Sequence, residues 1–127
     1  MSYTDIQNEV IKEYKIDLCD GTRCKEGDWY RTHAHPRLRR VCKWKQVNSI
    51  QSTFTLFHEI GHIVANNSKM RRAEEEYYAT LWAIWCCDRY NLTIPPKTIE
   101  LYQDYIDREK SRGVRRGGSG YDDYQLP

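Results

Sequence analysis

Apolar residues recur at helical spacing near the start of the chain and again throughout its second half. In the first segment, Ile6, Val10 and Tyr14 recur every fourth position, so they lie along one face of a helix. Thr4 can cap this helix, and Gln7 can complete a capping box three residues later. The pattern predicts a helix that begins at Thr4 and ends at Tyr14.

Three further helices are predicted after residue 49. Apolar positions repeat at intervals of three and four between residues 50 and 65, as one buried stripe would. A second long helix is predicted over residues 71–90, with Leu81, Trp82 and Trp85 on its buried side. Residues 93–97 contain two prolines, which a first turn tolerates, and open a last helix. The apolar stripe of this last helix is Ile99, Tyr102, Tyr105 and Ile106.

The segment between the first and second helices has the shorter periodicity of strands. Ile16 and Leu18 alternate with polar neighbours, and residues 29–32 and 41–46 are rich in aromatic and β-branched side chains. Asp20-Gly21 and Pro36 are turn signals between these stretches. We therefore expect an α+β fold in which a small antiparallel sheet packs on the helix at 50–65 and on two further helices.

Composition limits the size and the class of the protein. The chain of 127 residues is the size of one domain, which we expect to span residues 1–110. A hydrophobic fraction of 39% is enough for a modest core, and the net charge of +2 says little about partners. From Ser111 onward Gly, Arg, Ser and Asp dominate, so residues 111–127 are predicted to form a disordered tail.

Neither a secretory signal nor a membrane span is evident in the sequence. The first residues lack a basic start followed by an apolar stretch, and no apolar run has the length of a span. The five cysteines are an odd number, and Cys86-Cys87 is an adjacent pair that suits a disulfide framework poorly. We therefore expect a cytoplasmic protein with reduced thiols.

The most specific chemical feature is the pentapeptide His58-Glu59-Ile60-Gly61-His62 within the apolar helix. Residues four apart share one face of a helix, so His58 and His62 can reach one metal ion. Zn²⁺ binds imidazole nitrogen at about 2.0–2.1 Å, and the two histidines supply half of a tetrahedral shell. Glu59 stands beside that face, where a carboxylate can accept a proton from metal-activated water.

A plainer interpretation is a core helix whose histidines bond neighbouring carbonyl groups. Polar groups in a dry core are costly without partners, and a bound metal removes that cost, so we favour a zinc site. A catalytic zinc needs a third protein ligand. Glu74, Glu75 and Glu76 on the next helix are candidates, although all three could be a solvated acidic first turn.

With these residues the chain resembles the ImmA/IrrE family of small metallopeptidases. That family combines a Thr-Leu-x-His-Glu-x-Gly-His helix with a later Glu-x-x-Ala-(Asn/Asp)-x-Phe-Ala helix. Residues 55–62 match the first element closely, and residues 76–83 match the second imperfectly. The resemblance covers about residues 40–90 and assigns the third ligand to Glu76, three residues before Ala79. It implies a zincin-like fold and a Zn²⁺ centre.

Two positions depart from the family pattern. Thr80 stands where the family has Asn or Asp, so a hydrogen bond to a ligating histidine would have to come from a hydroxyl. Ile84-Trp85-Cys86-Cys87 replaces the family's Leu-Leu-Met-Pro, as in a divergent member. The resemblance implies an endopeptidase that cleaves a specific intracellular protein, often a repressor encoded beside it on a phage or another mobile element.

Several assignments stay open from the sequence. Tyr77, Tyr78, His33 and His35 are candidates for stabilising an oxyanion. The basic strand at 40–45 could line an extended peptide substrate, or it could be a solvated outer face. Cys19-x4-Cys24 followed by His33 and His35 could form a second zinc site, although the spacing matches no strong finger pattern.

Two other functions compete with hydrolysis. A catalytically weak or inactive domain of this fold could act by binding a protein partner. Nucleic-acid binding is thinkable through residues 37–45, which are basic and include Trp44, and through the arginine-glycine segment 112–118. The small net charge and the acidic pair Asp122-Asp123 argue against nucleic acid.

Overall fold

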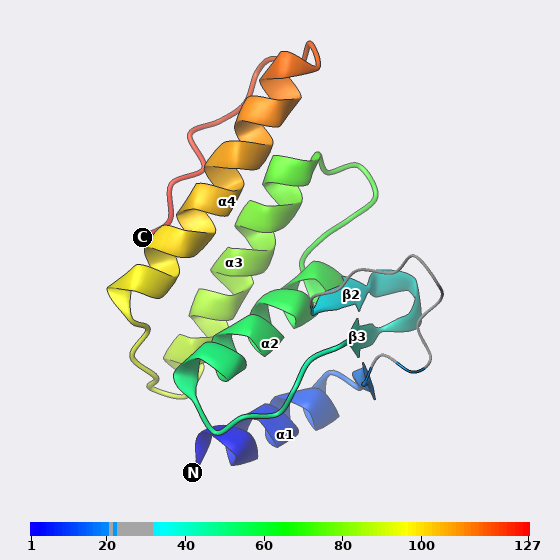
Figure 1. Cartoon of the computed structure of the whole chain (residues 1–127), viewed down its shortest axis with the longest axis vertical. Coiled ribbons are helices and arrows are strands. Elements are labelled where there is room, and N and C mark those ends of the chain that lie inside the picture. Colours follow the sequence, from blue (N-terminus) through cyan, green and yellow to red (C-terminus); the bar gives the residue numbers. More distant parts are fainter. Residues whose placement is uncertain (21, 23–31) are drawn as a thin grey trace.

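The computed structural model describes residues 1–20, 22 and 32–127. Within them the helices are α1 (Tyr3–Glu13), α2 (Ile50–Val64), α3 (Arg72–Arg89) and α4 (Pro96–Arg115). The strands are β1 (Asp17–Cys19), β2 (His33–His35) and β3 (Arg40–Cys42), and the short 3-10 helix η1 (Pro36–Leu38) joins β2 to β3. The fold is α+β, as the sequence predicts (Figure 1).

The sheet is mixed, so the prediction of an antiparallel sheet is wrong for one of its pairings. The strand order is β1-β3-β2, with β1 parallel and β2 antiparallel to β3. The turn at η1 returns the chain antiparallel, whereas residues 20–32 are long enough to carry it from β1 across to the far side of β3. The strand expected at 41–46 ends at Cys42, where Lys43 adopts a φ of 59°. Of the strand expected at 29–32, only Thr32 lies within the described residues, and it is outside β2.

The N-cap of helix α1 lies two residues earlier than predicted. The side chain of Ser2 accepts a hydrogen bond from the backbone N–H of Asp5, and the Asp5 carboxylate accepts one from the N–H of Ser2. Ser2 and Asp5 therefore form the capping box that the sequence assigned to Thr4 and Gln7. Gln7 is instead buried and donates to the hydroxyl of Thr53 on α2, at 2.8 Å.

Helix α2 lies at the centre of the fold. α1 and the sheet pack against it, α3 packs along it, and α4 covers α3 (Figure 1). Its fully buried apolar residues are Phe54, Leu56, Phe57 and Ile60. The helix that carries the histidine motif is therefore the main element of the hydrophobic core, which fixes the position of the motif.

Small residues form the buried face of α3. Its buried side chains are Ala73, Ala79, Thr80, Ala83, Cys86 and Cys87. Trp85, predicted on the buried side, is 49% exposed. Small side chains let two helix backbones approach closely, whereas an indole ring would hold them apart. This choice of residues sets the separation between α2 and α3.

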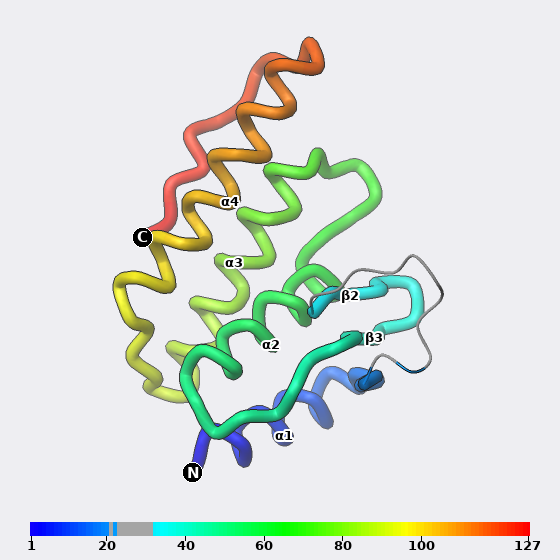
Figure 2. The backbone as a smooth tube through the Cα atoms, in the orientation of Figure 1, coloured from blue at the N-terminus to red at the C-terminus, as the bar shows by residue number. Residues whose placement is uncertain are grey.

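The segment from Ser111 onward, for which a disordered tail is predicted, packs against the helices in the structure. α4 continues to Arg115, and the chain then runs back along it, as the tube in Figure 2 shows. Gln103 on α4 donates to the carbonyl of Tyr124 at 3.0 Å and accepts from the N–H of Leu126 at 2.8 Å. Tyr124 is buried with Ala73 and Ile106. A few apolar side chains thus hold a segment whose average composition is polar.

Candidate metal centre

Three side chains from α2 and α3 converge at one point. Nε2 of His58 lies 3.1 Å from Nε2 of His62 and 3.0 Å from Oε2 of Glu76. Nε2 of His62 lies 3.4 Å from Oε1 of Glu76. His58 and His62 are one helical turn apart on α2, and Glu76 projects from α3. The structure thus brings together the three residues that the sequence and the family resemblance singled out as ligands.

The spacing fits a shared ion. Two nitrogens bound tetrahedrally to Zn²⁺ at about 2.0–2.1 Å would lie about 3.3 Å apart. The three observed separations of 3.0, 3.1 and 3.4 Å are close to that value. Two histidines and a carboxylate are also the donor set of many catalytic zinc sites, which leave a fourth position open. The residues present therefore fit Zn²⁺.

Close contact between the helix backbones makes this convergence possible. A Cβ atom added to Gly61 would lie 2.5 Å from the carbonyl oxygen of Ala79 and 2.9 Å from its Cα. Only glycine fits at such a distance. Gly61 lies between His58 and His62 on α2, and Ala79 is three residues after Glu76 on α3. The close contact between the helices is therefore within one turn of each candidate ligand. Gly61 and Ala79 thus set the distance across which Glu76 meets the histidines.

Thr80 fixes the orientation and the tautomer of His58. Its hydroxyl lies 2.7 Å from the backbone carbonyl of Glu76 and 3.1 Å from Nδ1 of His58. A hydroxyl has one proton, and a carbonyl oxygen can only accept, so Thr80 donates to Glu76 and accepts from Nδ1–H of His58. Nδ1 of His58 is thereby engaged by Thr80, and Nε2 is the nitrogen that faces Glu76 and is left for a metal. The family has Asn or Asp at this position, and here the hydroxyl of Thr80 makes the hydrogen bond with the histidine instead.

Asn66 performs the same task for His62. Its side-chain amide lies 2.8 Å from Nδ1 of His62, and its buried Oδ1 has no partner among the described residues. A half-turn of the amide exchanges its oxygen and nitrogen. Oδ1 then accepts a hydrogen bond from Nδ1–H, which leaves Nε2 of His62 free to bind metal. We therefore assign this orientation to Asn66, a residue that sequence reasoning did not single out.

Tyr102 on α4 was also missed as part of the site. Its ring lies 4.6 Å from that of His58, centroid to centroid, and it also packs against Phe54. Burial raises the pKa of Tyr102, so its phenol stays neutral. The residue belongs to the predicted apolar stripe of α4, and the stripe gave no sign that it would contact a histidine. Tyr102 shields one side of the candidate centre from water.

The charges of the site favour a cation. Burial alone would raise the pKa of Glu76, but its hydrogen bonds with His58 and His62 outweigh burial and place that pKa well below the usual range. Burial alone would lower the pKa of His62, but the hydrogen bond with Glu76 and its charge produce a net increase. The three groups share protons across short distances, and a divalent cation can take the place of those protons.

Glu59 lies beside the ligands without being one of them. Burial raises its pKa, and the nearby charges of His58 and His62 only partly offset that effect. No hydrogen bond to another described residue holds its carboxylate. A carboxylate in this position and environment can act as a general base.

The other predicted candidates lie outside the centre. Glu74 pairs with Arg71 at 2.8 Å, which agrees with a partly solvated first turn. Tyr77 packs against Tyr124 in the C-terminal segment, and Tyr78 is 40% exposed. Among the described residues, neither tyrosine forms a hydrogen bond or a ring contact with His58, His62 or Glu76. His33 and His35 lie on β2, and His33 is close enough for its charge to act on Glu59.

Cys19, Cys42, Cys86 and Cys87 are buried, and Cys24 lies outside the described residues. None of the described helices combines the length and the apolar character needed to cross a membrane.

Comparisons with models of protein families, with curated proteins and with solved structures found no match. Function must therefore be inferred from the residues of the site.

Proposed function

We propose that this protein is a zinc-dependent peptidase in which His58, His62 and Glu76 hold Zn²⁺ and Glu59 is the general base. One observation carries the proposal: three potential ligand atoms from two helices lie 3.0–3.4 Å from one another. Thr80 and Asn66 support it, because each, in the orientation assigned above, accepts a hydrogen bond from Nδ1–H of a histidine and leaves Nε2 of that ring available.

When bound, Zn²⁺ supplies a Lewis acid that polarises a peptide carbonyl and lowers the pKa of a neighbouring water. Glu59 accepts the proton of the attacking water and returns it to the leaving amine. The raised pKa of Glu59 suits both tasks, because a base with a pKa closer to neutrality gives its proton back more readily. Tyr102 limits access of bulk water to His58.

A peptide substrate would lie along β2. The sequence suggested the strand at 40–45, but β3 is paired on both sides, so its backbone groups cannot bind another strand. β2 has β3 on one side only among the described residues, and it packs against α2. A peptide added to β2 would pass beside the helix that carries the ligands.

The basic side chains Arg39 and Arg40 contact the chain itself, at Tyr14 and Asp17, which weakens the case for nucleic acid.

The resemblance to the ImmA/IrrE family adds the class of target. On that basis we propose that the substrate is a specific intracellular regulatory protein, such as a repressor, that is cleaved in the cytoplasm. A domain that binds its partner without cleaving it is the competing function.

The experiment combines metal analysis with a cleavage assay. Protein purified without added metal should contain about one Zn²⁺ per chain at this centre, and it should cleave members of a random peptide library, read by mass spectrometry. Glu59→Gln should keep the metal and the fold but lose cleavage. Glu75→Gln is the matched control, because it removes a neighbouring acid that is not among the ligand atoms.

Cleavage by Glu59→Gln at the rate of the unaltered protein would remove Glu59 from the mechanism. An unaltered protein that binds zinc and cleaves no peptide would favour the binding domain. A protein that holds no metal after incubation with Zn²⁺ would contradict the proposal altogether.

A further inference from the structure

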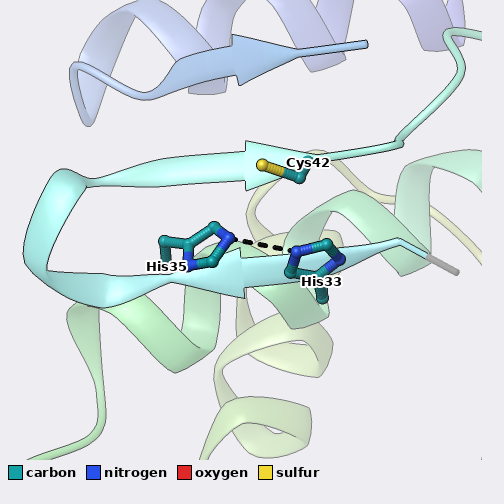
Figure 3. A group of neighbouring side chains, drawn as sticks. All are labelled: His33, His35 and Cys42. Atoms are coloured by element: carbon teal, nitrogen blue, oxygen red, sulfur yellow. Dashed lines mark hydrogen bonds between the residues drawn. The ribbon is translucent and has the colours of Figure 1, made fainter. Parts of the chain in front are cut away.

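A second group of side chains that can bind metal lies on the sheet and shares no residue with the first. His33 and His35 are two residues apart on β2, so they point to the same side of the strand. Cys42 on β3 is the cross-strand partner of His33 and therefore lies on that side too. Figure 3 shows the three side chains projecting from one side of the β2–β3 pair.

The ligand atoms of these residues are as close as those of a metal site. Nε2 of His33 lies 3.1 Å from Nε2 of His35, and the nitrogen and sulfur atoms of the three residues lie within 4.8 Å of one another. An ion bound to both nitrogens at about 2.0–2.1 Å would hold them about 3.3 Å apart. Zn–S bonds are about 2.3 Å long, so a shared ion would place the sulfur about 3.6 Å from each nitrogen.

We propose that His33, His35 and Cys42 form a second metal site, which takes a zinc-like cation with an affinity for thiolate. Two imidazoles and one thiolate suit Zn²⁺ and its spectroscopic substitute Co²⁺, whereas Mg²⁺ and Ca²⁺ prefer oxygen. His33 is 8% exposed and Cys42 is fully buried. His35 is only partly buried, so the site can be reached from solvent on that side.

The surrounding sheet supports the arrangement. η1 closes the β2–β3 turn, and the hydroxyl of Thr32 donates to the carbonyl of Lys43 at 2.9 Å at the other end of the pair. Arg40 faces His35 across the sheet, and its charge is paired with Asp17 at 2.8 Å. The nearest cationic side chain on β3 therefore has its charge balanced, which reduces repulsion of a bound cation.

This ligand set revises the second zinc site that the sequence suggested. His33 and His35 remain, but Cys42 takes the part assigned to Cys19 and Cys24. Cys19 on β1 lies opposite Cys42 in the register of the parallel strands β1 and β3. Its sulfur is outside the group of atoms that converge. Cys24 lies outside the described residues. The site shares no ligand with His58, His62 and Glu76, so it does not depend on the proposed peptidase function.

Cobalt binding tests the proposal, because a thiolate ligand to Co²⁺ gives a near-ultraviolet charge-transfer band and the His58 site contains no sulfur. The unaltered full-length protein should bind about two Co²⁺ per chain and show the band. His62→Ala should bind less Co²⁺ and keep the band. Cys42→Ser should lose the band and still bind about one Co²⁺, which also shows that it is folded.

Cys19→Ser is the matched control and should keep the band. His35→Ala, at the partly exposed position, should weaken Co²⁺ binding at this site at least tenfold, read from the titration of the band. No band at excess Co²⁺, a band that persists in Cys42→Ser, or a band lost in Cys19→Ser would each overturn the proposal. Because His62→Ala reports on the second site alone, failure of the peptidase centre would not be mistaken for failure of this one.

Discussion

Thr80 on α3 holds His58 on α2 in a single tautomer. The hydroxyl donates to the carbonyl of Glu76 at 2.7 Å and lies 3.1 Å from Nδ1 of His58, so Nδ1–H of the ring donates to the hydroxyl and Nε2 is left to face Glu76. The residue that orients one ligand is thereby bonded to the backbone of another. Loss of this hydroxyl should affect metal binding more than it affects the fold.

We expect Thr80→Val, which keeps the shape of the side chain, to lower the affinity for Zn²⁺ about 10–100-fold. Nδ1–H of His58 would lose its acceptor, so the ring could turn or change tautomer. Competition with a fluorescent chelator measures the affinity. Thr80→Ser retains the hydroxyl and should bind Zn²⁺ within a few-fold of the unaltered protein. Equal affinities for the valine and serine variants would show that the contact has no role.

Gly61→Ala should destabilise the protein although alanine is the better helix former. The higher helix propensity of alanine would add about 1 kcal/mol to stability. However, the new methyl would lie 2.5 Å from the carbonyl oxygen of Ala79 and force α2 and α3 apart. We expect a net loss of about 1–3 kcal/mol in the free energy of unfolding, measured in urea on the metal-free protein.

The added methyl meets the backbone of Ala79 and not its side chain. Ala79→Gly introduced together with Gly61→Ala should therefore fail to restore stability. A Gly61→Ala protein more stable than the original would mean that the two helices are further apart than described.

Asn66 offers a test of the amide orientation assigned above. An aspartate can only accept, so Asn66→Asp should preserve the hydrogen bond from Nδ1–H of His62 and keep Zn²⁺ affinity at or above its original value. Asn66→Leu removes the acceptor and should cost about 10–100-fold. Isothermal titration with Zn²⁺ distinguishes the two. If Asn66→Asp binds as weakly as Asn66→Leu, the amide donates to His62 and does not accept from it.

The helices and the convergence of His58 with His62 were predictable because their signals are long or local. A stripe of apolar residues over fifteen positions identifies α2, and a four-residue spacing places His58 and His62 together whatever the rest of the chain does. Glu76 required the family pattern, since spacing alone did not separate it from Glu74 and Glu75. The bounds of α3 and the start of α4 were found to within a few residues for the same reason.

The sheet and the tail were not predictable to the same extent. Strands of three residues have too few positions to reveal direction or register, so the pairing of His33 with Cys42 could not be read from the sequence. The C-terminal segment is ordered by isolated contacts such as Tyr124 with Ala73, which average composition hides. Trp85 is exposed because it lies off the face of α3 that Ala79, Ala83 and Cys86 bury.

The thiols of Cys86 and Cys87 should lower stability at high pH. Burial raises the pKa of each to about 12 from an unfolded value of 9.0. Between these values the unfolded chain loses the protons and the folded chain keeps them, so the free energy of unfolding falls as the pH rises. Below pH 9 the contribution is fully present. The decline measured between pH 9 and 11 should be shallower in Cys86→Ala than in the unaltered protein.

The same shift governs reactivity. At pH 8 the thiolate fraction at a pKa of about 12 is about a thousandfold below that at 9.0, so the folded protein should resist alkylation at both positions. Mass spectrometry after iodoacetamide treatment identifies the modified residues, and the urea-unfolded protein is the control. Rapid labelling of Cys86 in the folded state would contradict its burial.

Because the candidate ligands come from α2 and α3, any ion they hold would be a crosslink between the two central helices. An ion at about a hundred times its dissociation constant adds about 2.7 kcal/mol to the free energy of unfolding. That is a large share of the total for a domain of this size. The amount of folded protein in a cell would then rise and fall with the supply of free zinc. Metal starvation would therefore reduce the amount of folded protein as well as empty the site.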